Sequence, residues 1–145
     1  MFYLSRYFDA QRTEYIARLR NLNGPRSWND WVAFFLRALA AQADVNAATA
    51  RGILALYKRL KTSAIALTHS EFAVPLLDRL FAQPVFASSA LFGQPDLPTK
   101  PAVTKLLNQL RKAGILKQLR PSSGRRAQVL ALHELVKLCE GKRVL

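Results

Sequence analysis

The residues of this sequence that are best suited to chemistry are basic, and they gather in one stretch. Between Leu97 and His133 there are eight lysine and arginine residues and no acidic residue. Arginine and asparagine side chains can hydrogen-bond base edges in a major groove, whereas lysine and threonine suit phosphate oxygens. The stretch therefore predicts contact with double-stranded DNA. The candidate contact residues are Lys100, Thr104, Lys105, Asn108, Arg111, Lys112, Arg125 and Arg126.

Two other interpretations of this basic stretch stay open: a face that docks an acidic protein, and a solvated surface with no specific partner. Single-stranded nucleic acid is disfavoured, because proteins that bind it interleave stacking aromatic residues with their cationic groove. Ten of the fourteen aromatic residues lie in residues 1–57, and none lies between Leu97 and His133. Asn108 and Arg111 favour DNA, whereas the aromatic-rich first half favours protein docking.

The charge balance of the whole chain narrows the classes of partner. Across 145 residues, 22 lysines and arginines outnumber nine aspartates and glutamates, which gives a net charge of +13. An excess of this size favours a polyanionic partner, such as nucleic acid, an acidic protein face or a membrane surface. No uncharged apolar stretch is long enough to cross a bilayer, so no transmembrane helix is predicted.

Signatures of enzymes and of metal sites are missing from the sequence. It contains no phosphate-binding glycine loop, no Gly-x-Ser-x-Gly elbow and no paired carboxylates near a histidine. The one cysteine, Cys139, cannot form an internal disulfide, which favours the cytoplasm, and we expect it to be a small buried apolar residue. With only His69 and His133 as imidazole ligands, neither a metal nor another cofactor is predicted.

The first 68 residues predict helices that together form a connector segment. Apolar residues recur at helical spacing up to the breaker Asn23-Gly24-Pro25. Ser27 and Asp30 resemble a capping box, so a longer helix is expected to begin there. We expect this helix to break at residues 44–46. Its expected apolar face is Trp28, Trp31, Val32, Phe35, Leu36 and Leu39, and a further helix would pack through Ile53, Tyr57, Leu60, Ala64 and Leu67.

Residues 69–145 predict a second domain, in which short helices precede a β-hairpin. One helix ends at Pro84, and a second is expected within residues 85–94. A third begins after Thr99 as its N-cap and stops at Gly114. The expected buried residues of the first and third helices are Leu76, Leu77, Leu80 and Phe81, then Val103, Leu106, Leu107 and Leu110.

The hairpin follows directly on the third helix. Two strands are expected, at 115–120 and 127–132, around the turn Pro121-Ser122-Ser123-Gly124, and a last helix at 133–140. Three short helices followed by a hairpin is the order of a winged helix-turn-helix, whose third helix is the recognition helix and whose hairpin is the wing. The predicted fold class is mainly α: a helical connector of residues 1–68 and a winged helix of residues 69–145.

Several segments together resemble the C-terminal region of Fic-family proteins. In the first half they are Phe2-Tyr3-Leu4-Ser5-Arg6-Tyr7-Phe8, Arg12, Glu14, Tyr15, Trp28-Asn29-Asp30-Trp31 and Phe34-Phe35-Leu36. In the second half they are Leu76 to Pro84, Gly114-Ile115-Leu116 and Gly124-Arg125-Arg126. Tyr15-Ile16 stands where such proteins usually have a pair of tyrosines.

The resemblance implies a role beside an enzyme rather than as one. Fic-family proteins transfer AMP from ATP to hydroxyl side chains through a motif His-x-Phe-x-(Asp/Glu)-Gly-Asn-Gly-Arg-x-x-Arg, and this sequence does not contain it. The motif would be expected before Met1. The implied function is a non-catalytic accessory module whose winged helix binds DNA. The alternative is a docking or dimerisation module that recruits the target or regulator of the enzyme.

Self-association is a further expectation. The aromatic residues of the first half crowd more than one side of short helices, and an uncovered apolar patch of that kind favours association. We therefore expect a homodimer that forms through residues 1–68.

Overall fold

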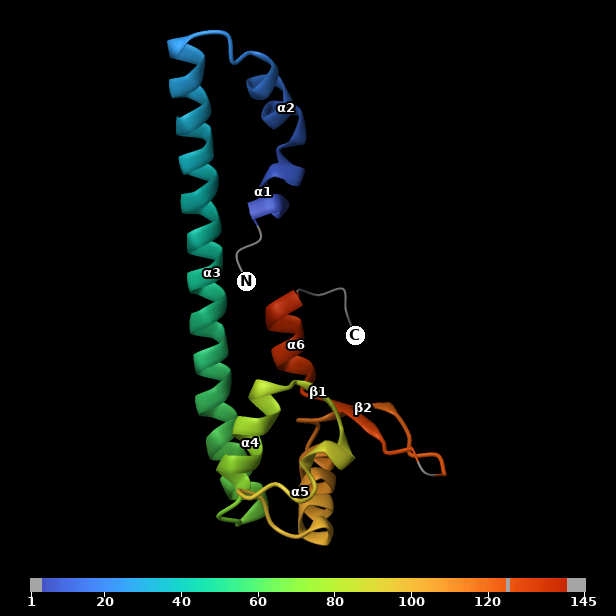
Figure 1. The fold of residues 1–145 in the computed structure, drawn as a ribbon. Coiled ribbons are helices and arrows are strands. Elements are labelled where there is room, and N and C mark those ends of the chain that lie inside the picture. The colour runs from blue at the N-terminus through green and yellow to red at the C-terminus, as the bar shows by residue number, and fades with distance from the viewer. Residues whose placement is uncertain (1–3, 125, 141–145) are drawn as a thin grey trace. The chain divides into compact units, whose positions relative to one another are not determined.

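The computed structural model describes residues 4–124 and 126–140, and the chain divides into two compact units, Met1–Arg51 and Gly52–Leu145. Helices predominate, and three short strands form one antiparallel sheet (Figure 1), which confirms the mainly α fold class. The sequence places a boundary after residue 68. Helix α3 (Pro25–Thr68) does end there, but its residues from Gly52 onward belong to the second unit because they pack in that unit's core.

The first unit contains α1 (Leu4–Ala10), α2 (Arg12–Arg20) and the first part of α3, beside which α1 and α2 lie (Figure 1). The predicted helical run is therefore interrupted at Gln11. The prediction of Ser27 as the cap of α3 is wrong, because the helix begins at Pro25, whose fixed φ and missing N–H suit a first helical position. The Ser27 hydroxyl instead donates to the carbonyl of Gly24 and accepts from its N–H.

Helix α3 continues through residues 44–46, so the predicted break there is wrong. No proline or glycine interrupts the sequence between Ser27 and Arg51. The Asn46 side chain, which could have competed for backbone hydrogen bonds, instead accepts one from Gln42 Nε2 at 3.0 Å, one turn earlier. The polar residues in this segment therefore add bonds along the helix rather than ending it.

An aromatic cluster around Phe34 holds the first unit together. Phe34 is 2% exposed, and its ring lies 6.2 Å from that of Tyr7, 6.1 Å from that of Phe8 and 5.8 Å from that of Trp31. The Arg18 guanidinium of α2 lies over the same ring, 5.3 Å from its centre. The predicted apolar face of α3 is thus covered only along one side, and Trp28, Val32, Phe35, Leu36 and Leu39 remain exposed.

The second unit has a continuous apolar core to which α3, α4 (Ala73–Ala82) and α5 (Lys100–Lys112) all contribute. The predicted faces of α4 and α5 are confirmed, with Phe81 half-buried and the other residues buried. On α3 the predicted packing residues Leu60 and Ala64 are buried, whereas Leu67 is exposed. The buried leucines and valine of α4 and α5 are Leu76, Leu77, Leu80, Val103, Leu106, Leu107 and Leu110.

The segment predicted as a helix at residues 85–94 begins instead with a strand. Strand β1 (Val85–Ala87) pairs antiparallel with β3 (Val129–Ala131), and only then follows a short 3-10 helix, η1 (Ser88–Leu91). Valine and phenylalanine favour strands, and Phe86 is buried opposite Leu130 in the pairing. Leu91 at the end of η1 is buried, and Phe92 directly after it is half-buried.

The sheet has the strand order β1-β3-β2, with β2 (Lys117–Arg120) at one edge and antiparallel to β3. The predicted hairpin is confirmed with shorter strands, and residues 115 and 116 lie in the bend between the end of α5 at Lys112 and the start of β2. There Gly114 adopts a φ of 76°, and the N–H groups of Gly114 and Ile115 bond to the carbonyls of Arg111 and Leu110. The last helix, α6 (His133–Glu140), has its predicted bounds. No helix in the described ranges could cross a membrane.

Candidate nucleic-acid interface

Helix α5 presents its polar side away from the core of the second unit. Its valine and leucines are buried, and on the opposite side of a 3.6-residue turn lie Lys105, Asn108 and Lys112. Both lysines are exposed, and Asn108 is half-buried. These three predicted contact residues therefore share one outward face, with a neutral hydrogen-bonding group between two cations.

Two other predicted residues lie in the first turns of α5 and already have partners within the protein. The Thr104 hydroxyl donates to the carbonyl of Lys100 at 2.8 Å, so its proton is used within the helix. The Lys100 ammonium lies over the Phe92 ring, 5.3 Å from its centre, and the lysine remains exposed. Lys100 is therefore available for an anion, whereas Thr104 is less suited to donate to a phosphate than its residue type suggests.

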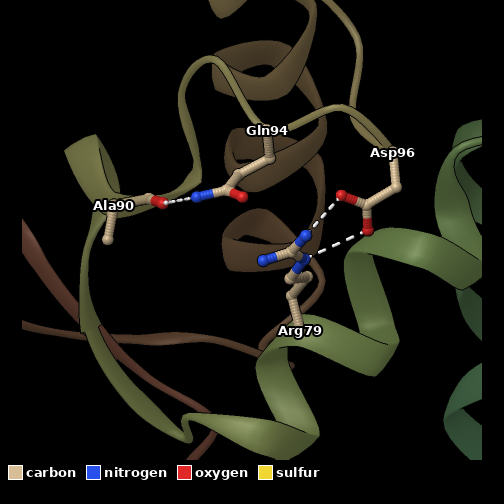
Figure 2. Close-up of polar contacts among 4 residues, drawn as sticks. All are labelled: Arg79, Ala90, Gln94 and Asp96. Carbon is tan, nitrogen blue, oxygen red and sulfur yellow. Dashed lines mark hydrogen bonds and ion pairs between the residues drawn. The ribbon is translucent and has the colours of Figure 1, made fainter.

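The loop that leads into α5 is held by polar contacts to α4 and η1. Arg79 of α4 donates two hydrogen bonds to the Asp96 carboxylate, at 3.0 and 2.5 Å, and Gln94 Nε2 donates to the carbonyl of Ala90 (Figure 2). The hydrogen bond from Arg79 lowers the pKa of Asp96 below its ordinary value. The acid nearest to α5 in the sequence is thus paired, and the loop that sets the start of α5 is anchored.

Arg111 lies in the last turn of α5, on the flank of the helix that faces strand β2. It is half-buried, and its Nη1 donates to Oε1 of Gln118 at 2.7 Å. The predicted pair of base-recognising residues is therefore split: Asn108 lies on the outward face, and Arg111 lies beside the hairpin. The contact with Gln118 could not be predicted from the sequence, because it depends on the register of β2.

The turn of the hairpin is closed by two backbone hydrogen bonds between Ser123 and Arg126, at 2.9 and 3.1 Å, with Gly124 at a φ of 53°. Arg126 is exposed, as a residue that grips a phosphate would be. Its predicted neighbour Arg125 lies outside the described residues. Two basic residues that are not in the predicted site, Lys117 and Arg120, are also exposed on the edge strand β2.

Two further acidic residues of the second unit, Asp78 and Glu134, have partners on other elements. Tyr57 of α3 donates to Asp78 of α4 at 2.6 Å, a hydrogen bond that raises the pKa of the tyrosine. Arg59 forms an ion pair with Glu134 of α6. Because the sequence between Leu97 and His133 contains no acid, α5 and the hairpin carry charge of a single sign.

Histidine, cysteine and acidic side chains do not gather in the described ranges. No group of three or more histidine, cysteine or acidic residues there could hold a metal ion. Cys139 is exposed on α6, so the expectation of a buried cysteine is wrong. The buried residues of this helix are Leu135 and Val136, and Cys139 is not among them. His69 is exposed directly after α3, with a φ of 48°.

Comparison with known proteins adds no assignment. No protein-family model matches the chain, and no curated protein matches it. The function is therefore inferred from the geometry and charge of α5 and the hairpin.

Proposed function

We propose that the second unit binds double-stranded DNA as a winged helix-turn-helix, with α5 as recognition helix and the β2–β3 hairpin as wing. Its elements follow in the order α4, β1, η1, α5, β2, β3, and the edge strand β2 leads into the hairpin directly after α5. This order supports the comparison with winged helices, in which a short helix or turn precedes the helix that enters the major groove.

The observation that carries the proposal is the single sign of charge on α5 and the hairpin. Backbone phosphates supply the bulk of the affinity of DNA-binding proteins, and exposed cations without interspersed acids attract them best. The exposed cations in the described part of α5 and the hairpin are Lys100, Lys105, Lys112, Lys117, Arg120 and Arg126.

Within this proposal the residues divide by role. Lys105, Lys112 and Arg126 contact phosphates, as Arg125 does in our sequence interpretation. Asn108, on the outward face of α5, approaches base edges together with Arg111. The direct test is the affinity of the full chain for random-sequence duplex DNA, measured by fluorescence anisotropy as the salt concentration is varied. Failure to bind would reassign the face to an acidic protein partner.

We also propose that the first unit self-associates, because α3 exposes an apolar stripe there. Trp28, Val32 and Leu36 are 54%, 46% and 56% exposed, and with Phe35 and Leu39 they form one uncharged arc of the helix. The exposed side chains form one contiguous apolar patch, and patches of this kind mark interaction sites on soluble proteins. A second copy, which carries the same arc, could cover it symmetrically.

This association should be visible in the mass of the chain in solution. We expect light scattering to show a dimer at micromolar concentration and a monomer for the double variant Trp28→Glu with Leu36→Glu, since two buried carboxylates would oppose pairing. Leu54→Glu is a matched control, because Leu54 is as exposed on α3 but belongs to the other unit. A wild-type chain that stays monomeric throughout the micromolar range would contradict the proposal.

The sequence resemblance supplies the proposed context for both activities. We propose a cytoplasmic, non-catalytic accessory module of a Fic-type AMP-transferring protein, with no cofactor of its own. What supports this is the set of resembling segments, together with the absence of the AMP-transfer motif from the sequence. In this context the winged helix would bring the enzyme to DNA, or, in the alternative, to an acidic protein target.

A further inference from the structure

The hydrogen bond between Arg111 and Gln118 joins the proposed recognition helix to the proposed wing. Gln118 is exposed on the edge strand β2, and it pairs with Leu130 of β3, a residue with no exposed surface. Residues directly opposite in an antiparallel pair point to the same face of the sheet. Gln118 therefore reaches Arg111 from a strand that is paired with the core strand β3, and the register of this pairing shifts only after it, between Gln118 and Arg120.

The chemistry of the bond leaves the guanidinium usable. Arginine has five donors in one plane, and Gln118 Oε1 accepts from Nη1. Within the described part of the chain, Nε and Nη2 donate to no other group, and these two form an edge that can bond two acceptors side by side. Because the acceptor is a neutral amide, it restrains the orientation of the guanidinium without cancelling its charge.

A preset orientation of the guanidinium matters more for a contact to a base than for a contact to a phosphate. A phosphate offers acceptors in many directions, so an arginine that grips it needs no preset orientation. The O6 and N7 atoms of guanine accept two parallel bonds in one plane, and ordering the side chain beforehand lowers the entropic cost of that contact. A neutral, strand-anchored partner is thus suited to an arginine that recognises a base.

We infer that Gln118 is a positioning residue that presets Arg111 to recognise a guanine in the major groove of duplex DNA. This inference rests on the proposed DNA binding. Gln118 itself makes no base contact; it sets base preference through Arg111 and contributes nothing to affinity for random sequence.

The test is a double-mutant cycle on sequence preference. A preferred duplex is first selected from random sequences with the full wild-type chain, and the preference is its affinity relative to that of random duplex. Arg111→Ala should lower the preference by roughly 5- to 100-fold, the range for one bidentate base contact. Gln118→Ala should lower it by roughly 5-fold. In the Arg111→Ala background, Gln118→Ala should have no further effect.

Two additional measurements separate positioning from a general loss of structure. Replacing one guanine of the selected site by 7-deazaguanine, which lacks the N7 acceptor, should weaken binding of the wild type but not of Arg111→Ala. Gln83→Ala, at an exposed position after α4, is the matched control and should change neither quantity.

The outcomes distinguish this inference from the function on which it depends. If the wild type fails to bind random duplex, both the proposed function and the inference are overturned. If it binds but Gln118→Ala leaves the preference unchanged, or lowers it equally with and without Arg111, only the role of Gln118 is overturned.

Discussion

Reversing the charge of Lys105 and Lys112 together should weaken binding to random duplex DNA by about 100-fold or more at ~0.1 M salt. Each lysine is exposed on the outward face of α5, and each glutamate would both remove a phosphate contact and add repulsion. The double variant Lys105→Glu with Lys112→Glu should keep the fold, because neither side chain enters the core. Fluorescence anisotropy titrations measure the loss directly.

A matched control separates the effect of the two lysines' position on α5 from the effect of the net charge of the chain. Lys58 and Lys61 are also exposed, lie on α3 in the same unit, and change the net charge by the same amount when both become glutamate. The loss of DNA affinity in this control should be smaller than that in the α5 double variant by an order of magnitude or more. The reason is that screening at ~0.1 M salt limits the reach of distant charges to about 10 Å. Equal losses in the two variants would mean that binding responds to total charge and not to α5.

Truncation of Leu107 should destabilise the second unit by about 3–5 kcal/mol, because a buried leucine loses both its transfer free energy and its packing when a cavity remains. Leu107 has no exposed surface and lies at the centre of the apolar side of α5. A loss of this size is a large part of the stability of a typical domain. Urea unfolding followed by circular dichroism should show the lower midpoint.

Leu119→Ala is the matched comparison for this prediction. Leu119 lies on the edge strand β2 and is 40% exposed, so its truncation should cost less than ~1 kcal/mol. If Leu107→Ala unfolded at the same urea concentration as the wild type, the core described for the second unit would be wrong. If it unfolds earlier but still binds DNA when folded, the core and the interface are separable.

Elements with local signals could be predicted from the sequence. The bounds of α5 follow from its apolar spacing and from Gly114, which alone tolerates the φ of 76° found there without strain. The hairpin follows from its turn residues. Strand β1 could not be predicted in the same way, because three residues carry too little periodicity and its pairing with β3 joins distant parts of the chain. The hydrogen bond from Gln42 to Asn46 within α3 likewise could not be predicted from the sequence.

The candidate site was predictable in its residue types and not in its geometry. The outward placement of Lys105, Asn108 and Lys112 follows from helical spacing alone. The engagement of Arg111 by Gln118 requires the register of β2. The pairing of Asp96 with Arg79 requires the path of the loop before α5. Contacts between side chains on different elements depend on the tertiary structure, so they could not be predicted from the sequence.

The salt dependence of duplex DNA binding tests the central proposal most directly. If Lys105, Lys112, Arg125 and Arg126 contact about four phosphates, the logarithm of the association constant should fall with the logarithm of the salt concentration with a slope near −3.6, since each released counterion contributes roughly −0.9. Changing both Arg125 and Arg126 to alanine should make that slope shallower by about two contacts. A wild-type chain that shows no binding to random duplex even at ~50 mM salt would contradict the proposal.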